Sequence, residues 1–433
     1  MLRAAKFALL FFLLLPSPAP RAQSPQPTTR IARVSITGLR TLPPEPFLLV
    51  AALPPGANAA KDDLQAAADR LLQLGLFSRV TYEYRTFADG LSVTFHAEEA
   101  PRVPVLFDNM PTLDDSEINT ALHADLPYFD GTAPETGSAL DAIASSLRQF
   151  LQSRNINAAI EHQLVPNPLG DGALQQFRAI GADSRIASVE FSDALASTSP
   201  KLPADLSALL GKPYSRLAIQ LFLAEKVRPL YLQHGFLRVH FATPQIRLAG
   251  PPAARLPDSL PVFIPITPGI AYRWQAAEWS GNAALSSTLL NERLGMTTGA
   301  VADGQAIDLA WERILDEYGR HGYVNAKLSP QAHYDDSSST VSFHVAIEEE
   351  NQYRHGDLLL TGLSVNGEAK VRAAWPIPPG EIFDKTKYDL FLGQLQSHSR
   401  AIFGNMPVNF DQVGHWLECH PENKTITVML DFK

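Results

Sequence analysis

One pattern recurs along this chain: a turn rich in Gly or Pro, a helix, a break made of a small residue and an aromatic residue, and then two strands. Four of the breaks read Leu74-Gly75-Leu76-Phe77, Gln233-His234-Gly235-Phe236, Arg320-His321-Gly322-Tyr323 and Ala401-Ile402-Phe403-Gly404. A pattern that repeats in this way indicates structural units in series. The sequence therefore predicts an array of small domains and not one large core.

The composition is that of folded domains. The chain has 433 residues, of which 45% are hydrophobic and 19% charged, with a formal net charge of -9. Length alone predicts about three domains, whereas the repeat predicts about five domains of roughly 80 residues each. A negative net charge disfavours a nucleic-acid partner, which would select a basic surface.

Residues 1–22 have the layout of a signal peptide. Arg3 and Lys6 precede an apolar run at 7–15 that is much shorter than the ~20 residues of a membrane-spanning helix. We expect cleavage after Ala19 or Ala22, then a polar linker at 23–30; the alternative is an uncleaved N-terminal anchor. No later segment is apolar enough for a transmembrane helix, so we expect an exported, soluble mature chain.

The expected fold class is α+β, with each domain in the order strand, helix, helix, strand, strand. Each domain would form a three-stranded mixed sheet covered by two helices, and the expected bounds are 31–100, 101–183, 184–269, 270–351 and 352–433. The second domain is the weakest match because its break, Ser153-Arg154-Asn155-Ile156, lacks both the Gly and the aromatic residue. In the third domain Pro229 should kink or end the second helix, and residues 249–257 lie in an inserted loop. Asp62 or Asp63 is expected to cap the second helix of the first domain.

Strand order follows from proline placement. If the closing strand of each domain is central, the strand after the break lies at an edge of the sheet. Pro244, Pro330 and Pro407 all fall on that strand, and edges are where sheets tolerate proline. An open edge can pair with another chain. The candidate partner-binding residues on these edges are Val80, Tyr82, Tyr84, Leu237, Val239, Phe241, Val324, Ala326 and Leu328.

The repeated pattern resembles the POTRA domain, the polypeptide-transport-associated module of the Omp85 family of outer-membrane assembly and secretion proteins. The matching residues are Gly38, Gly281 and Gly362 after the first strands, the Gly-aromatic breaks, and the acidic strand ends at Glu98-Glu99 and Glu348 to Glu350. The resemblance implies a periplasmic array, associated with the outer membrane of Gram-negative bacteria, that binds partner lipoproteins and unfolded barrel precursors. Family members normally continue into a membrane β-barrel. We expect none here, because the sequence ends at Lys433.

Residues of the types that occur in catalytic or metal sites have structural interpretations in this sequence. We expect no catalytic, metal or cofactor site, because no zinc-protease, paired-cysteine or nucleophile-elbow motif occurs. His234, His321 and His355 are attributed to capping or solvation, with a ligand role as the alternative. Glu348 to Glu350 is attributed to a solvated strand end, with an ion or partner role as the alternative.

The glycines of the breaks, Gly75, Gly235 and Gly322, are expected to end helices with a positive φ. The aromatic residues after them, Phe77, Phe236 and Tyr323, are expected to anchor the second helix to the sheet. A peptide pocket at these aromatic residues is the alternative.

Three functions remain open. The first is a scaffold that binds unfolded outer-membrane or secreted polypeptides by adding them as strands to its exposed edges. The second is a structural spacer or docking subunit for a separately encoded outer-membrane barrel or for assembly lipoproteins. The third is an envelope enzyme, which would require a convergent polar site that the sequence does not reveal.

Overall fold

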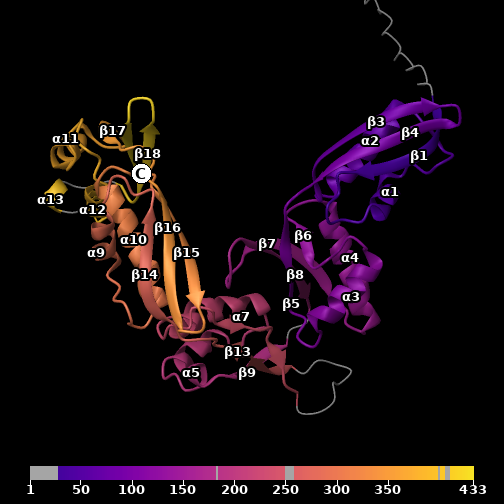
Figure 1. The fold of residues 1–433 in the computed structure, drawn as a ribbon, viewed down its shortest axis with the longest axis horizontal. Coiled ribbons are helices and arrows are strands. Elements are labelled where there is room, and N and C mark those ends of the chain that lie inside the picture. The colour runs from indigo at the N-terminus through magenta and orange to yellow at the C-terminus, as the bar shows by residue number, and fades with distance from the viewer. Residues whose placement is uncertain (1–27, 182–183, 249–257, 398–399, 405–409) are drawn as a thin grey trace, which may run out of the picture. The chain divides into compact units, whose positions relative to one another are not determined.

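The computed structural model describes residues 28–181, 184–248, 258–397, 400–404 and 410–433 (Figure 1). The expected signal peptide, most of the linker, the inserted loop at 249–257 and Pro407 lie outside these residues. The chain divides into two compact bodies, residues 1–167 with 172–181, and residues 168–171 with 182–433. Within the described ranges, no helix combines the length and apolar character needed to cross a bilayer.

The first domain contains two helices and a mixed sheet in the order β2-β1-β4-β3. Its first and closing strands are parallel, and the closing strand pairs with the strand after the break in antiparallel register. The elements are β1 (Thr29–Thr37), α1 (Glu45–Ala51), β2 (Asn58–Ala59), α2 (Lys61–Gln73), β3 (Phe77–Phe87) and β4 (Gly90–Glu99). The closing strand β4 is therefore central, and β3 is an edge.

The second domain repeats this arrangement with the strand order β6-β5-β8-β7. Its elements are β5 (Arg102–Asp108), α3 (Asp115–Asp125), β6 (Thr132–Pro134), α4 (Ser138–Ser153), β7 (Ala159–Pro166) and β8 (Ala173–Ile180). Asn155 stands where the other breaks have glycine, and it adopts the same left-handed conformation, with a φ of 59°. The break that lacks glycine is thus built with asparagine, one of the few side chains that tolerates this conformation.

The third domain departs most from the expected fold, because its sheet is divided into β11-β12-β9 and a separate β10-β13 pair. Its strands are β9 (Arg185–Phe191), β10 (His240–Phe241), β11 (Gln245–Ile246), β12 (Ser259–Ile264) and β13 (Ile266–Thr267). Its first helix is broken into α5 (Ala194–Ser197), α6 (Leu202–Asp205) and η1 (Leu206–Ala208). The second helix consists of α7 (Arg216–Phe222), the π-helical turn η2 (Leu223–Val227) and α8 (Arg228–Leu232), so Pro229 lies in the first turn of a new helical segment.

The fourth and fifth domains have three-stranded sheets in the orders β14-β16-β15 and β17-β19-β18. The fourth is built from β14 (Arg273–Ser280), α9 (Ser287–Leu294), α10 (Gly304–Arg320), β15 (Lys327–Asp335) and β16 (Thr340–Glu348). The fifth is built from β17 (Arg354–Thr361), α11 (Val365–Ala374), α12 (Lys385–Gln396), α13 (Arg400–Phe403), β18 (Val413–His420) and β19 (Thr425–Phe432). The predicted α+β class and tandem βααββ organisation are confirmed.

One detail of that prediction was wrong. The first and second domains have four strands, because β2 and β6 add to the outer side of the first strand. In the other three domains the same pairing is reduced to a single bridge, Arg185 with Pro213, Arg273 with Val301 and Arg354 with Ile382. The predicted cap of α2 is confirmed for Asp63, which lies at the third position of the helix and accepts a hydrogen bond from the backbone N–H of Ala60 at 2.7 Å.

Each domain buries its own apolar core between helices and sheet. In the fourth domain, the closing strand contributes Val341, Val345 and Ile347, while the second helix contributes Ile307, Ala310 and Ile314. The helical residues recur at three- and four-residue intervals, and the strand residues alternate, as one buried face of each element requires. The opposite face of the sheet is largely exposed in this domain, and so is the edge strand β15.

Candidate functional site

The edge strand β3 is long and largely exposed. Val80, Tyr82 and Tyr84 lie opposite Ala97, Phe95 and Val93 of β4, on the face that the helices cover. Val80 and Tyr82 pack partly against the core of the first domain, whereas Tyr84 lies further along the strand and is 49% exposed. The strand therefore offers unpaired backbone groups next to an aromatic side chain that its own helices leave uncovered.

A hollow of about 230 Å³ lies at the far end of β3. It is lined by Glu83, Tyr84, Arg85, Phe87, Ser92 and Thr94. Phe87 is 56% exposed. A strand added beside β3 would thus meet apolar surface and both signs of charge at the tip of the hairpin.

The edge strand β15 has the same position in the fourth domain. Leu328 lies opposite Ile347, and Pro330 lies opposite Val345, on the helix-facing side of the sheet. The strand begins at Lys327, so Val324 and Ala326 are not strand residues, and this part of the prediction was wrong. Val324 instead packs partly against the core of the fifth domain.

The predicted edge strand at 237–241 was also wrong for most of its length. The N–H of Leu237 donates to the carbonyl of Gly235, and that of Val239 donates to Phe236, so these residues form turns. Only β10 is extended, and Phe241 packs edge-on against Tyr231 at 6.0 Å. Leu237 packs partly against the core of the fourth domain. Leu237 and Val324 are therefore junction residues, because the chain turns directly into the next domain.

The glycines of the breaks lie at junctions between domains. Gly75, Gly235 and Gly322 have φ values of 79°, 83° and 83°. A Cβ on them would lie 1.7 Å from the carbonyl oxygen of Thr136, 2.6 Å from that of Tyr272 and 2.6 Å from that of Tyr353, respectively. Each glycine thus both ends a helix and allows the following domain to approach its backbone.

The aromatic residues after the glycines pack on neighbouring aromatic rings. Phe77 is buried edge-on against Phe47 with ring centroids 5.0 Å apart. Phe236 contacts Tyr231 at 6.1 Å. Tyr323 contacts Tyr318 at 6.0 Å. In the third and fourth domains these contacts hold the break against the end of the second helix.

Polar contacts reinforce the junction between the third and fourth domains. The Tyr272 hydroxyl donates to Asp336 at 2.5 Å, and the Arg238 guanidinium donates to Tyr272 at 3.1 Å and to Asp336 at 3.2 Å. The Arg238 guanidinium also lies 5.4 Å from the ring centroid of Tyr334. These contacts stabilise one arrangement of the two domains.

The acidic strand ends are not simply solvated. Glu99 accepts hydrogen bonds from the backbone N–H groups of Arg40, Thr41 and Leu42 and from the Thr41 hydroxyl, at 2.7–3.0 Å. Partial burial alone would raise the pKa of Glu99, but these hydrogen bonds lower it to about 2. Glu349 similarly accepts from the Ala284 N–H and the Tyr318 hydroxyl. Both carboxylates fix the loop that leads into the first helix.

The histidines have structural roles of two kinds. The His234 ring lies 2.7 Å from the carbonyl of Leu230 at a helix end, and His321 lies 3.3 Å from Glu317. His355 was expected to be solvated or capping, and this was wrong: it is 2% exposed in β17, with its ring 5.3 Å from that of Trp375. Within the described part of the chain, no cluster of three or more His, Cys, Asp or Glu could hold a metal ion.

A family model matches the fourth domain. The POTRA model, described as a surface antigen variable number repeat, matches residues 272–350. Residues 272–350 are therefore similar in sequence to a POTRA domain. The match covers β14 to β16 with both helices between them, together with Tyr272, whose backbone N–H donates to the junction glycine Gly235.

Relatives and solved structures carry related names. A curated protein of Treponema pallidum (strain Nichols), named "Putative outer membrane protein assembly factor", is 22% identical over 123 residues, which are 28% of this chain and 15% of that protein. POTRA domains 3–5 of BamA from Haemophilus influenzae are 17% identical, with a TM-score of 0.44, over 58% of this chain and 96% of that one. POTRA domains 1–3 of Omp85 from Anabaena are 13% identical, with a TM-score of 0.21, over 76% of this chain and 98% of that one.

The other domains share the strand pairing of the fourth domain. In all five, the first strand runs parallel to the closing strand. In four of them, the strand after the break pairs antiparallel on the other side of the closing strand. The other four domains therefore share the parallel pairing of first and closing strands with the domain that the POTRA model matches.

Sequence reasoning missed two features of these domains. One is Trp416 on β18, the edge strand of the fifth domain, whose side chain is 52% exposed. The other is an Arg at the start of three first strands, Arg185, Arg273 and Arg354, whose guanidinium donates to the carbonyl of a glycine between the two helices at 2.7–2.9 Å. In each case the glycine follows its Arg by 26 residues, a constant spacing that could have revealed the pair.

Proposed function

We propose that this chain is a periplasmic scaffold that binds other polypeptides during outer-membrane protein assembly or secretion. The POTRA match and the name of the Treponema pallidum relative support this assignment. The signal peptide proposed at residues 1–22 would export the chain, and we propose domain bounds close to residues 100, 183, 269 and 351. Its partners would be unfolded outer-membrane or secreted polypeptides, together with an outer-membrane barrel or assembly lipoproteins.

The observation that carries the proposal is the strand order. In the first, fourth and fifth domains the closing strand is central, which leaves β3, β15 and β18 as edges of eight to eleven residues. A strand of that length offers several unpaired N–H and C=O groups to an incoming chain. The proposed mechanism is therefore addition of an extended client as a further strand.

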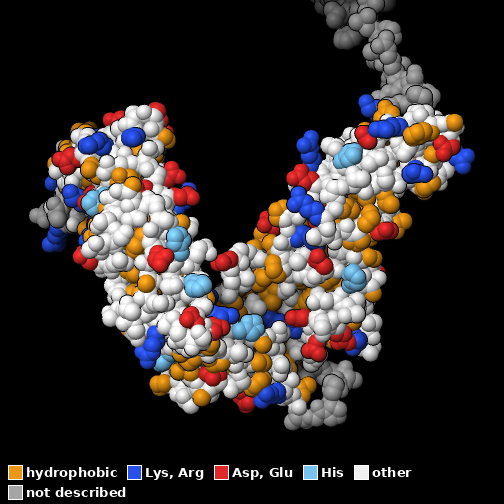
Figure 2. Space-filling view, in the orientation of Figure 1, with side chains coloured by type: hydrophobic (Ala, Val, Ile, Leu, Met, Phe, Trp, Pro, Cys, Tyr) orange, Lys and Arg blue, Asp and Glu red, His pale blue; other side chains and the backbone are white. Residues whose placement is uncertain are grey.

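This mode of binding suits many clients. Backbone hydrogen bonds contribute about 1 kcal/mol each and do not depend on the client sequence. Tyr84 on β3, Leu328 on β15 and Trp416 on β18 would add apolar contacts at alternate positions of the bound strand. On the face shown in Figure 2, basic and acidic side chains are interspersed, which favours no single client charge.

Amide hydrogen exchange of the full chain tests this mechanism. Saturation with an extended peptide taken from an outer-membrane β-strand should slow exchange in β3, β15 or β18, because the edge N–H groups gain partners. The central strands β4 and β16 already pair on both sides and serve as internal controls. Binding without slower exchange on any edge strand would contradict strand addition.

A second candidate function is that of a spacer or docking subunit, and the glycine junctions favour it. Close backbone contacts at Gly235 and Gly322 would hold the third, fourth and fifth domains in a fixed order. This alternative predicts one tight protein partner and weak binding of extended peptides. Crosslinked recovery of a single partner from cell envelopes, with no client peptides bound by the purified chain, would support it over the first.

A further inference from the structure

The third domain leaves a second kind of strand edge open. Its first strand, β9, lies at the end of the sheet order β11-β12-β9. On the outer side of β9, Ile186 exchanges backbone hydrogen bonds with Lys212 and Gly211, at 3.0 and 2.9 Å. Among the described residues, no strand flanks β9 beyond that point. This edge is distinct from the edges that follow the Gly-aromatic breaks.

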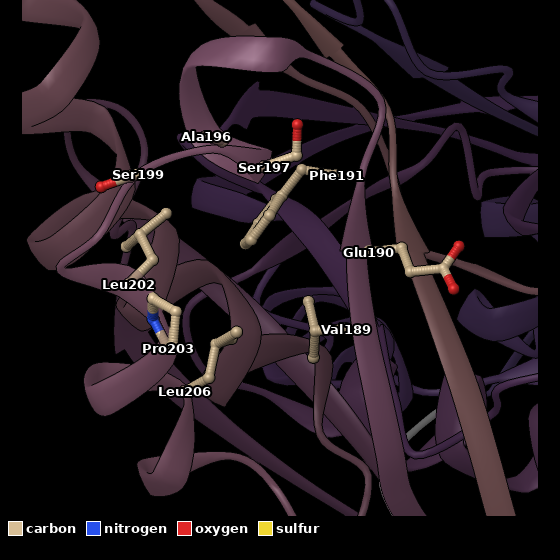
Figure 3. A pocket seen from close by; sticks show the side chains of 9 residues that line it. All are labelled: Val189, Glu190, Phe191, Ala196, Ser197, Ser199, Leu202, Pro203 and Leu206. Atoms are coloured by element: carbon tan, nitrogen blue, oxygen red, sulfur yellow. The ribbon is translucent and has the colours of Figure 1, made fainter.

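A hollow of about 320 Å³ lies beside this edge, where the first helix is broken into three short pieces. We call it the β9 hollow; it is lined by Val189, Glu190, Phe191, Ala196, Ser197, Ser199, Leu202, Pro203 and Leu206. Figure 3 shows the side chains of Val189, Phe191 and Leu202 directed into this space, whereas the Glu190 carboxylate points to the other side of β9. The volume is at the lower end of the range of about 300–1,000 Å³ for ligand pockets.

The fourth and fifth domains occupy the equivalent place with their own side chains. Trp279 pairs with Val345 of the closing strand, and Phe191 pairs with Ile264 of the closing strand in the third domain. Trp279 and Phe191 therefore occupy equivalent positions. The Trp279 indole donates to Asn291 of the first helix at 3.0 Å and packs edge-on against Trp311. In the fifth domain, Arg372 of the first helix donates to the outer carbonyl of Leu358 at 2.9 Å. The third domain has no comparable contact among its described residues.

We propose that the β9 edge and the β9 hollow bind an extended polypeptide segment in which apolar and basic residues alternate. Backbone groups of β9 would pair with the segment. Side chains on facing strands share a face, so the apolar residues of the segment would enter the hollow beside Val189 and Phe191. Its basic residues would lie beside Glu190, which is exposed and makes no ion pair with a described cation. This inference rests on the proposed polypeptide-binding function and adds a site and a charge preference to it.

Peptide titration of the full chain tests the site. The probes are two fluorescent peptides of about eight residues, a usual strand length, one alternating Leu with Lys and one alternating Leu with Glu. Phe191→Trp should fill the hollow as Trp279 does in the fourth domain, and Glu190→Lys should reverse the local charge. Each should weaken binding of the Leu-Lys peptide about tenfold, the factor that corresponds to about 1.4 kcal/mol. Glu190→Lys should also tighten binding of the Leu-Glu peptide.

The matched control is Glu278→Lys, because Glu278 occupies the position of Glu190 in the fourth domain, beside a filled hollow. It should leave both affinities unchanged.

Equal loss of Leu-Lys peptide binding in Glu278→Lys and Glu190→Lys would overturn the inference, since the effect would then follow net charge alone. Peptide binding that is insensitive to Phe191→Trp and Glu190→Lys, but is lost when β3 or β15 is blocked, would overturn it and leave the proposed function standing. If neither the parent chain nor any variant binds either peptide, both this inference and the proposed polypeptide-binding function fail. A dimer that Phe191→Trp dissociates would identify a second copy of the chain as the occupant and overturn the proposal.

Discussion

The backbone N–H of Tyr353 donates a hydrogen bond to the carbonyl oxygen of Gly322 at 2.9 Å, across the junction between the fourth and fifth domains. Tyr272 makes the same contact with Gly235, also at 2.9 Å, across the preceding junction. The two glycines are the small residues of the Gly-aromatic breaks. The feature that marks the repeat in the sequence is therefore also the point at which one domain is attached to the next.

Gly322→Ala should destabilise this junction more than a positive φ alone requires. An alanine there pays about 1–2 kcal/mol for the left-handed conformation. Its Cβ would in addition lie 2.6 Å from the carbonyl oxygen of Tyr353 and 2.9 Å from a methyl carbon of Ile382, so the fifth domain must shift. Limited proteolysis should show faster cleavage between the domains, and thermal unfolding should occur at a lower temperature.

Gly299→Ala is the control for this change. Gly299 has the same φ of 83°, but a Cβ there would meet no atom within 4 Å. The Gly299→Ala variant should be destabilised only by the left-handed backbone conformation, and its cleavage at the junction should be unchanged. Equal effects of the two substitutions on junction cleavage would contradict the role assigned to Gly322.

Arg273→Ala should lower the free energy of unfolding of the fourth domain by about 1 kcal/mol, because the Arg273 guanidinium donates to the carbonyl of Gly299 at 2.7 Å. Lys327→Ala is a suitable comparison, since Lys327 lies 3.8–4.0 Å from Glu348 and Glu350 in exposed ion pairs that contribute little. Urea unfolding should separate the two variants. A larger loss with Lys327→Ala would show that surface charge, and not the Arg–Gly contact, supports the domain.

Glu99→Gln should remove an acid-sensitive part of the stability of the first domain. Because the folded state lowers the pKa of Glu99 from 4.5 to about 2, the ionised carboxylate stabilises the fold above about pH 4.5. That contribution is lost as the pH falls from 4.5 towards 2. Allowing for solvent screening, the variant should lose about 1 kcal/mol near neutral pH and less near pH 3.

Thermal unfolding near pH 7 and near pH 3 measures this difference, and Glu98→Gln is the matched control. Glu98 is the exposed neighbour on the same strand. Its substitution should have little effect at either pH. A cost for Glu99→Gln that does not shrink on acidification would refute the account of this carboxylate.

His355 should make the fifth domain less stable as the pH falls below about 6.5. Burial lowers the pKa of His355, although backbone groups of Ile377 and Pro378 act in the opposite direction, so the folded state keeps the ring neutral. On acidification the unfolded state takes up a proton near pH 6.5, whereas the folded state does not yet do so. The free energy of unfolding therefore decreases as the pH is lowered, until the folded-state pKa of His355 is reached. Urea unfolding at a series of pH values, followed by Trp fluorescence, should show this slope. His355→Phe should reduce it, and an unchanged slope would assign it to other groups.

The repeat made the fold predictable because its signals are local. Helix periodicity, the glycine at 75, 235 and 322, and alternating strands each depend on a few neighbouring residues. The third domain was less predictable, since the division of its sheet and the broken first helix depend on packing across more than 70 residues, as in the hydrogen bond between the Ile266 N–H and Ser192.

The candidate site was predicted less well than the fold, for a physical reason. Proline and alternation indicated that the strand after the break is an edge, but they do not show where that strand begins. Leu237 and Val324 lie just after the glycine, where the chain turns into the following domain, so their apolar side chains pack there. The burial of His355 likewise depends on contact with Trp375, which lies twenty residues away and has no local signature.

Photocrosslinking in the cells that produce this protein tests the central claim most directly. A photoreactive residue at Gln331 on the edge strand β15 is compared with one at His344, its partner on the central strand β16. A client strand added to β15 would lie about 5 Å from position 331 and about 10 Å from position 344. The account predicts adducts with outer-membrane or secreted polypeptides at 331 and few at 344. Equal adducts at both positions, or none at 331, would contradict binding by strand addition at this edge.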